Sequence, residues 1–154
     1  MQNKNNENLS LPDNIGAMIT NLAVINIEKS IELYTNLFGF EIVECAENDE
    51  GNIIFAILTY QNSSIMLHEP KAYKGQIPHP MTPPIEKDGP LVVTFYLYTN
   101  NVREKFKEFQ NHNLTILHEP TVQFWGDTTL RIKDINGYIW DFAEFRIPYE
   151  SHKM

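Results

Sequence analysis

Apolar and polar residues alternate along the first half of the chain in a pattern that predicts one strand, one helix and three further strands. Between Glu28 and Phe38 the apolar side chains recur at the spacing of one helical face, and Gly39 then ends the helix. The runs on either side have the short, β-branched character of strands. The predicted elements are a strand at 17–25, a helix at 28–38, and strands at 40–43, 52–60 and 64–69.

The second half repeats this order. Val102, Phe106 and Phe109 share one helical face, and the turn sequence 134–137 (DING) separates the last two predicted strands. The predicted elements are a strand at 91–98, a helix at 102–109, and strands at 114–117, 128–133 and 138–145. The fold class predicted from this repeat is α+β, built of two tandem βαβββ modules.

Composition shifts mark the expected boundaries of these modules. The Asn-rich start of the chain lacks an apolar core and predicts a disordered leader, while residues 70–90 hold six of the nine prolines and predict a stiff linker that could serve as a lid. We therefore expect the following organisation: a leader at 1–14, the first module at 15–70, a linker at 71–90, the second module at 91–147 and a tail at 148–154.

Charge and cysteine content narrow the classes of partner. With 12 Lys+Arg against 20 Asp+Glu the formal net charge is −8, which repels nucleic acid and anionic lipid and attracts cationic small molecules. The longest apolar stretch, 91–98, is far too short to cross a bilayer, and no signal peptide is apparent. A single cysteine, Cys45, excludes an internal disulfide and agrees with a cytoplasmic protein.

Two segments carry a resemblance to a known superfamily. Residues 28–44 (EKSIELYTNLFGFEIVE) and 125–142 (WGDTTLRIKDINGYIWDF) resemble the vicinal-oxygen-chelate proteins, which include glyoxalase I, extradiol dioxygenases and bleomycin-resistance proteins. Asn26 stands where the family has an aspartate, and Ile135 replaces the proline of its Asp-Pro-Asp-Gly turn. The resemblance implies one curved eight-stranded mixed sheet around a cavity, helices on the outside, and commonly a homodimer.

Metal-using members of the superfamily draw ligands from four strands, and the resemblance places those positions at Ile19, Met66, Thr94 and Asp141. Only Asp141 is a good ligand for a divalent cation, and His68 would add one more if the fourth strand is shifted in register. No metal cofactor is therefore expected. A divalent metal in a glyoxalase-like lyase or isomerase, or in a dioxygenase, is the alternative, with His68 and Asp141 as its weak candidate ligands.

Both of these residues also have interpretations that involve no metal. A three-residue hairpin loop with Gly137 in the left-handed conformation would place Arg131 opposite Asp141, where the two would form a cross-strand ion pair. Asp141 could instead contact a ligand. His68 is expected on the cavity side of its strand, either as a hydrogen-bonded wall residue or as the polar group that holds a ligand.

Aromatic residues supply the remaining candidate chemistry. Alternation on the strand at 91–98 turns Tyr96 and Tyr98 toward the cavity. Phe124 and Trp125 are expected in the same concave site, and Phe55 on the strand at 52–60 is a further candidate. Such rings bind planar or cationic molecules by burial, stacking and cation–π attraction, although aromatic residues on strands also pack cores. The resemblance is nearest to the bleomycin-resistance branch and implies small-molecule binding without chemistry. The predicted ligand-binding residues are Tyr96, Tyr98, Trp125, Phe124, His68, Asp141 and Arg131.

Overall fold

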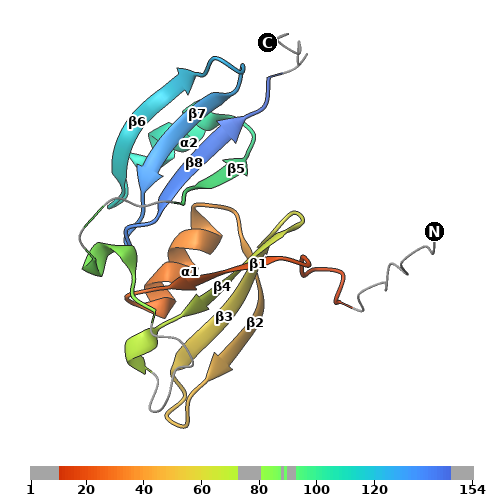
Figure 1. Ribbon diagram of the computed structural model, residues 1–154, viewed down its shortest axis with the longest axis vertical. Coiled ribbons are helices and arrows are strands. Elements are labelled where there is room, and N and C mark those ends of the chain that lie inside the picture. Colours follow the sequence, from red (N-terminus) through yellow and green to blue (C-terminus); the bar gives the residue numbers. More distant parts are fainter. Residues whose placement is uncertain (1–10, 73–80, 88, 90–92, 147–154) are drawn as a thin grey trace, which may run out of the picture. The chain divides into compact units, whose positions relative to one another are not determined.

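The computed structural model of the protein describes residues 11–72, 81–87, 89 and 93–146. The chain divides into two compact units, residues 1–80 and 81–154, and each unit holds one sheet and one α-helix (Figure 1). No helix within the described ranges is long and apolar enough to cross a membrane. Of the predicted leader, linker and tail, residues 1–10, 73–80, 88, 90 and 148–154 lie outside the described residues, as do residues 91–92 and 147 of the predicted second module.

The first unit is a βαβββ module with a mixed four-stranded sheet. Its elements are β1 (Ile19–Ala23), α1 (Ile27–Asn36), β2 (Glu41–Glu47), β3 (Ile53–Tyr60), β4 (Ser63–His68) and a 3₁₀ turn at Pro70–Ala72. The strand order is β1-β4-β3-β2; β1 runs parallel to β4, and the other neighbours are antiparallel. The module is therefore the one that the sequence predicts.

The second unit repeats the same topology. Its elements are a 3₁₀ turn at Pro84–Glu86, then β5 (Phe95–Tyr98), α2 (Val102–Phe109), β6 (Thr115–Val122), β7 (Thr128–Lys133) and β8 (Ile139–Glu144). The strand order is β5-β8-β7-β6, with β5 parallel to β8. The predicted fold class of two βαβββ modules is confirmed, and the hydrogen-bonded ladders of the described residues form one four-stranded sheet in each module.

Three strands, β2, β5 and β6, differ most from the sequence prediction. β2 and β6 are edge strands with exposed, partly polar side chains and shifts in register, so only their apolar first residues produced a recognisable pattern. β5 begins at Phe95, because Val93 and Thr94 lie outside the strand. The predicted Thr94 position consequently lies just before the sheet.

Both helices begin with the same pair of caps. The side-chain oxygen of Asn26 accepts the backbone N–H of Lys29, and that of Asn101 accepts the N–H of Glu104. A glutamate from the end of the last strand reinforces each cap: Glu69 accepts the first helical N–H of α1 at 3.0 Å, and Glu144 accepts that of α2 at 3.3 Å. The repeat is thus preserved at the level of single hydrogen bonds.

Each sheet has one face packed against its own helix. In the second module Phe142 of β8 contacts Phe109 of α2, with ring centroids 5.1 Å apart, and Trp140 lies on the same face of β8. These three side chains are fully buried. The opposite face of this sheet carries Tyr96, Tyr98 and Asp141, as the alternation predicts. We call it the open face of the second module.

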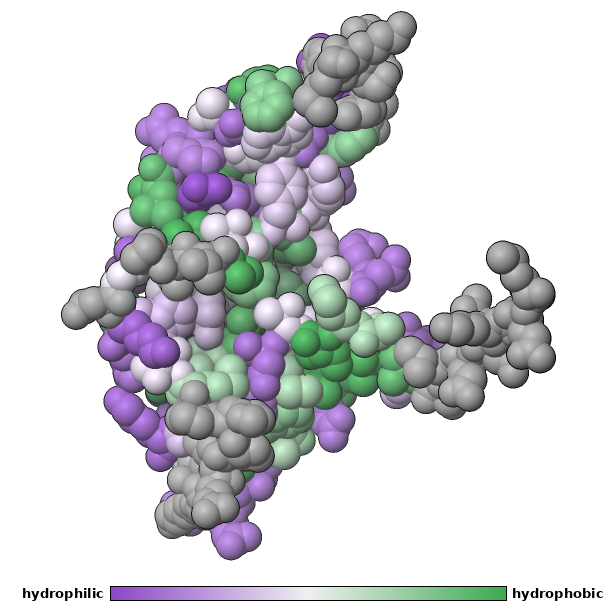
Figure 2. Space-filling view, in the orientation of Figure 1, coloured by the Kyte–Doolittle hydropathy of each residue, from purple (hydrophilic) through white to green (hydrophobic). Residues whose placement is uncertain are grey.

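Several large apolar side chains nevertheless reach the surface of the protein. Hydrophobic residues lie beside hydrophilic ones in the space-filling view (Figure 2). The most exposed of them in the second module is Phe124, with 85% of its surface accessible. In the first module it is Met18. Single exposed apolar residues are common, whereas a contiguous group often marks a binding surface.

Two hairpin loops of identical geometry join β2 to β3 and β7 to β8. In each, an Asx side chain accepts two backbone N–H groups of the loop, Asn48 from Glu50 and Asn52, and Asp134 from Asn136 and Tyr138. A glycine with positive φ completes both loops, Gly51 at +79° and Gly137 at +90°. This confirms the three-residue loop that the sequence predicts at residues 134–138.

We expect Gly137→Ala to cost about 2–3 kcal/mol of unfolding free energy, because it combines backbone strain with a backbone clash. A Cβ at Gly137 would lie 2.6 Å from the backbone N of Ile85, which donates to Asn136 O in this structure. Gly51→Ala is the matched control, since its φ is also positive and nothing lies within 4 Å. Urea denaturation measures both, and equal losses for the two variants would contradict the predicted contact.

Candidate functional site

Five aromatic side chains form a continuous row on the open face of the second module. Ring centroids are 4.8 Å apart for Phe124 and Trp125, 6.5 Å for Trp125 and Tyr96, 5.5 Å for Tyr96 and Tyr98, and 5.7 Å for Tyr98 and Phe145. All but Trp125 are at least 41% exposed. We call this group the aromatic row. It brings together the four aromatic residues that the sequence predicts and adds Phe145.

A single buried carboxylate fixes three of these rings. Asp127 Oδ2 accepts hydrogen bonds from the hydroxyls of Tyr96 (2.7 Å) and Tyr98 (2.9 Å) and from the indole N–H of Trp125 (3.2 Å). The same indole N–H also lies 3.1 Å from the hydroxyl oxygen of Tyr96. Because ordered polar ends restrict rotation of the rings, the row is held in place before any ligand arrives.

The loop between β6 and β7 places Asp127 there. Gly126 has a φ of +106°, and the backbone N–H of Gln123 donates to Asp127 O, so that the chain turns sharply before β7. Asp127 is only 1% exposed as a result. Partial burial, followed by the hydrogen bond to Asp127, raises the pKa of Tyr96, which keeps this hydroxyl protonated and available as a donor.

A row of polar residues crosses the open face beside the aromatic row. Register pairs Tyr96 with Asp141, Asp141 with Arg131, and Arg131 with His118. Arg131 Nε donates to Asp141 Oδ1 at 2.8 Å and its Nη2 donates to Oδ2 at 2.9 Å. This confirms the predicted cross-strand pair, and the hydrogen bond to Asp141 raises the pKa of Arg131. His118 Nε2 lies 4.0 Å from Asp141 Oδ1.

His68, the remaining predicted ligand-binding residue, lies in the first module. Its ring contacts Phe55 edge to face, with centroids 5.1 Å apart, and burial lowers its pKa below the ordinary value. Both residues belong to the first unit. The structure brings the other six predicted residues together on the second module and His68 together with Phe55.

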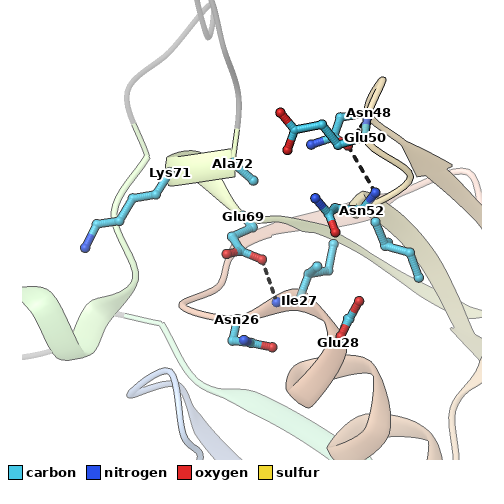
Figure 3. A pocket seen from close by; sticks show the side chains of 10 residues that line it. Asn26, Ile27, Glu28, Asn48, Glu50, Asn52, Glu69, Lys71 and Ala72 are labelled. Atoms are coloured by element: carbon cyan, nitrogen blue, oxygen red, sulfur yellow. Dashed lines mark hydrogen bonds between the residues drawn. The ribbon is translucent and has the colours of Figure 1, made fainter.

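A polar pocket of about 360 Å³ lies at the start of α1 (Figure 3). Glu28, Glu50 and Lys71 line it together with Glu69 and three asparagine side chains. Several of these groups already perform structural roles, because Glu69 caps α1 and Asn48 holds the β2–β3 loop. Glu144 caps α2 in the same way, so the Glu69 carboxylate at this pocket has a structural role in the fold. The aromatic row is therefore the stronger candidate site.

The donors near Asp141 do not fit a divalent metal. Both of its carboxylate oxygens accept hydrogen bonds from Arg131. In the first module, the two positions that the resemblance names, Ile19 and Met66, offer no hard donor atom. Within residues 11–72, 81–87, 89 and 93–146, no group of three or more His, Cys, Asp and Glu side chains lies close enough to hold a metal ion. Asp141, at the position that resembles a metal ligand, forms an ion pair with Arg131 instead.

Sequence reasoning did not identify Asp127, Phe145 or His118 as members of this surface. Asp127 lies two residues after Trp125, but only its contact with Tyr96 and Tyr98, about thirty residues away, reveals its role. Phe145 follows β8 and joins the row through Tyr98. His118 belongs to this surface because the register of edge strand β6 pairs it with Arg131, whereas the sequence predicted this strand to end at residue 117.

Comparison with solved structures shows a shared fold. TioX from Micromonospora sp. ML1 superposes with a TM-score of 0.62 at 18% identity, over 82% of this chain and 96% of that chain. A member of the Glyoxalase/bleomycin resistance protein/dioxygenase superfamily from Sphaerobacter thermophilus superposes with a TM-score of 0.58 at 20% identity, over 84% of this chain and 98% of that chain. Lactoylglutathione lyase from Agrobacterium tumefaciens superposes with a TM-score of 0.56 at 19% identity, over 84% of this chain and 92% of that chain. At these identities the likeness concerns the fold alone.

Sequence comparisons give the assignment to a family. A search of the curated proteins found no match to this chain. The family model of the Glyoxalase/Bleomycin resistance protein/Dioxygenase superfamily matches residues 17–142, from just before β1 to Phe142 of β8. The chain therefore belongs to the Glyoxalase/Bleomycin resistance protein/Dioxygenase superfamily.

Proposed function

We propose that this protein binds a small planar molecule against the aromatic row of its second module. The observation that carries the proposal is the convergence of Tyr96, Tyr98 and Trp125 on one buried oxygen of Asp127. Rings that merely pack a core need no common acceptor, whereas exposed rings held by one acceptor form a ready surface for stacking. Binding without a metal, by a cytoplasmic homodimer, is the form of the proposal that the sequence favours.

The neighbouring polar row supports binding rather than catalysis. Arg131 donates two short hydrogen bonds to Asp141, so neither side chain is available as a general acid or base. They supply a flat, polar edge beside the rings. A planar ligand would cover the faces of Tyr96 and Trp125 and leave its own polar groups toward this edge.

We expect Trp125→Ala to weaken binding of phenazine, a neutral planar probe, about tenfold, since one aromatic contact is worth ~0.5–1.5 kcal/mol beyond the area it buries. Trp125→Phe keeps a ring but loses the indole N–H and should weaken binding less. Ile42→Ala is the control, because Ile42 is 53% exposed and lies on β2 of the first module.

Isothermal titration measures all four proteins. Binding of phenazine that is unchanged by Trp125→Ala, or weakened equally by Ile42→Ala, would overturn the proposal. If a second copy of the chain covers this surface instead, no probe will bind, and the mass of the protein in solution will fall on dilution as the dimer dissociates.

A further inference from the structure

Among the described residues of the second module three aspartates are buried, and the side-chain contacts of two of them explain their burial. Asp141 meets the guanidinium of Arg131 with both oxygens. Asp134 accepts two backbone N–H groups with Oδ1 and the indole N–H of Trp140 with Oδ2. One therefore has its counter-ion, and the other holds a loop and a core side chain.

Asp127 differs from both. Among the described residues, its side-chain hydrogen bonds all end at Oδ2, and all three donors are neutral groups. No Lys, Arg or His in the described ranges lies within ion-pair distance of it, although the stem of Arg146 packs against the neighbouring Gly126. Asp127 is only 1% exposed, and among the described residues the partners of its carboxylate are these three neutral donors and no cation.

The charge of Asp127 acts on the rings that donate to it. A hydroxyl or indole N–H that donates to an anion places that anion at the polar end of its own ring, and the field adds to the negative potential above the ring face. Tyr96, Tyr98 and Trp125 all donate to the same oxygen. Their exposed faces should therefore attract a cation more strongly than the same rings without Asp127.

We propose that Asp127 is the residue that makes the aromatic row selective for planar cations over neutral planar molecules. The proposal rests on the proposed function and names the charge class of its ligand, a flat aromatic ring system carrying one positive charge. Asp127 is a specificity-determining residue that acts through the rings, and the ligand need not touch its carboxylate. The net charge of −8 favours the approach of the same ligands at long range.

The test compares two tricyclic probes of similar shape, 9-aminoacridine, which is a cation at neutral pH, and phenazine, which is neutral. In the unmodified protein the cation should bind at least about tenfold more tightly, as expected for desolvated cation–π contacts. Asp127→Asn keeps an acceptor oxygen of the same size and removes the charge. It should weaken binding of the cation about tenfold and change phenazine binding less than about threefold.

Asp49→Asn is the matched control, because Asp49 is exposed in the β2–β3 loop of the first module and its loss changes the net charge equally. This control should leave both affinities unchanged. If the two probes bind the unmodified protein equally, or if Asp127→Asn weakens both to the same extent, Asp127 has only a structural role and the inference is overturned. If neither probe binds, it is the proposed function itself that fails.

Discussion

Replacing Asp134 by alanine is expected to lower the free energy of unfolding by about 3–4 kcal/mol, the largest effect we predict. The substitution removes the acceptor of two loop N–H groups and leaves the indole N–H of Trp140 without its partner in the core. Both residues are buried, Asp134 to 4% exposure and Trp140 to 1%, so water cannot replace the lost bonds cheaply. Urea denaturation followed by circular dichroism measures the loss.

Asn48→Ala separates the two parts of this effect. Asn48 holds the β2–β3 loop with the same pair of hydrogen bonds, but contributes no bond to a buried indole among the described contacts. Its replacement should therefore cost only about 1 kcal/mol. If Asn48→Ala costs as much as Asp134→Ala, the buried bond to Trp140 does not stabilise the protein as we infer.

The second large effect is expected from Arg131→Ala, which should destabilise the protein by about 2–3 kcal/mol. The substitution leaves the carboxylate of Asp141, whose side chain is 6% exposed, without the guanidinium that binds both its oxygens. The cost is below that of a fully buried pair because the Arg131 side chain is 41% exposed and screened by solvent. Thermal and urea denaturation give the change.

A double replacement tests whether the loss comes from the stranded charge. Arg131→Met combined with Asp141→Leu removes both partners and keeps apolar volume, so it should recover most of the stability lost in Arg131→Ala. A double variant that is less stable than Arg131→Ala would show instead that the pair itself contributes net stability. The result also bears on function, because it decides whether Asp141 can be changed without unfolding the site.

The buried elements of the fold could be predicted from sequence because their side chains alternate or recur against a core. β7 and α2 match the predicted ranges 128–133 and 102–109. The edge strands β2 and β6 were predicted too short, because exposed residues on an edge need not follow a hydrophobic pattern. The Arg131–Asp141 pair could be predicted because a short loop of known type fixes the register of everything beyond it.

The site could be predicted only in part. Alternation on one strand correctly grouped Tyr96 with Tyr98, since both face the same side of the sheet. The acceptor that joins them to Trp125 could not be predicted, because Asp127 reaches them from the loop between β6 and β7, the two strands farthest from β5 in the sheet order. Contacts of this kind depend on the path of a loop, which periodicity does not describe.

Two indole signals offer the most direct test of binding at the aromatic row. The chain has two tryptophans, Trp125 in the row and Trp140 buried on the opposite face of the sheet, so each reports one side in a ¹H–¹⁵N spectrum. Titration with 9-aminoacridine should shift the Trp125 indole resonance in a saturable manner and leave that of Trp140 nearly unmoved. A saturable shift confined to Trp140, or binding that moves neither resonance, would contradict the account.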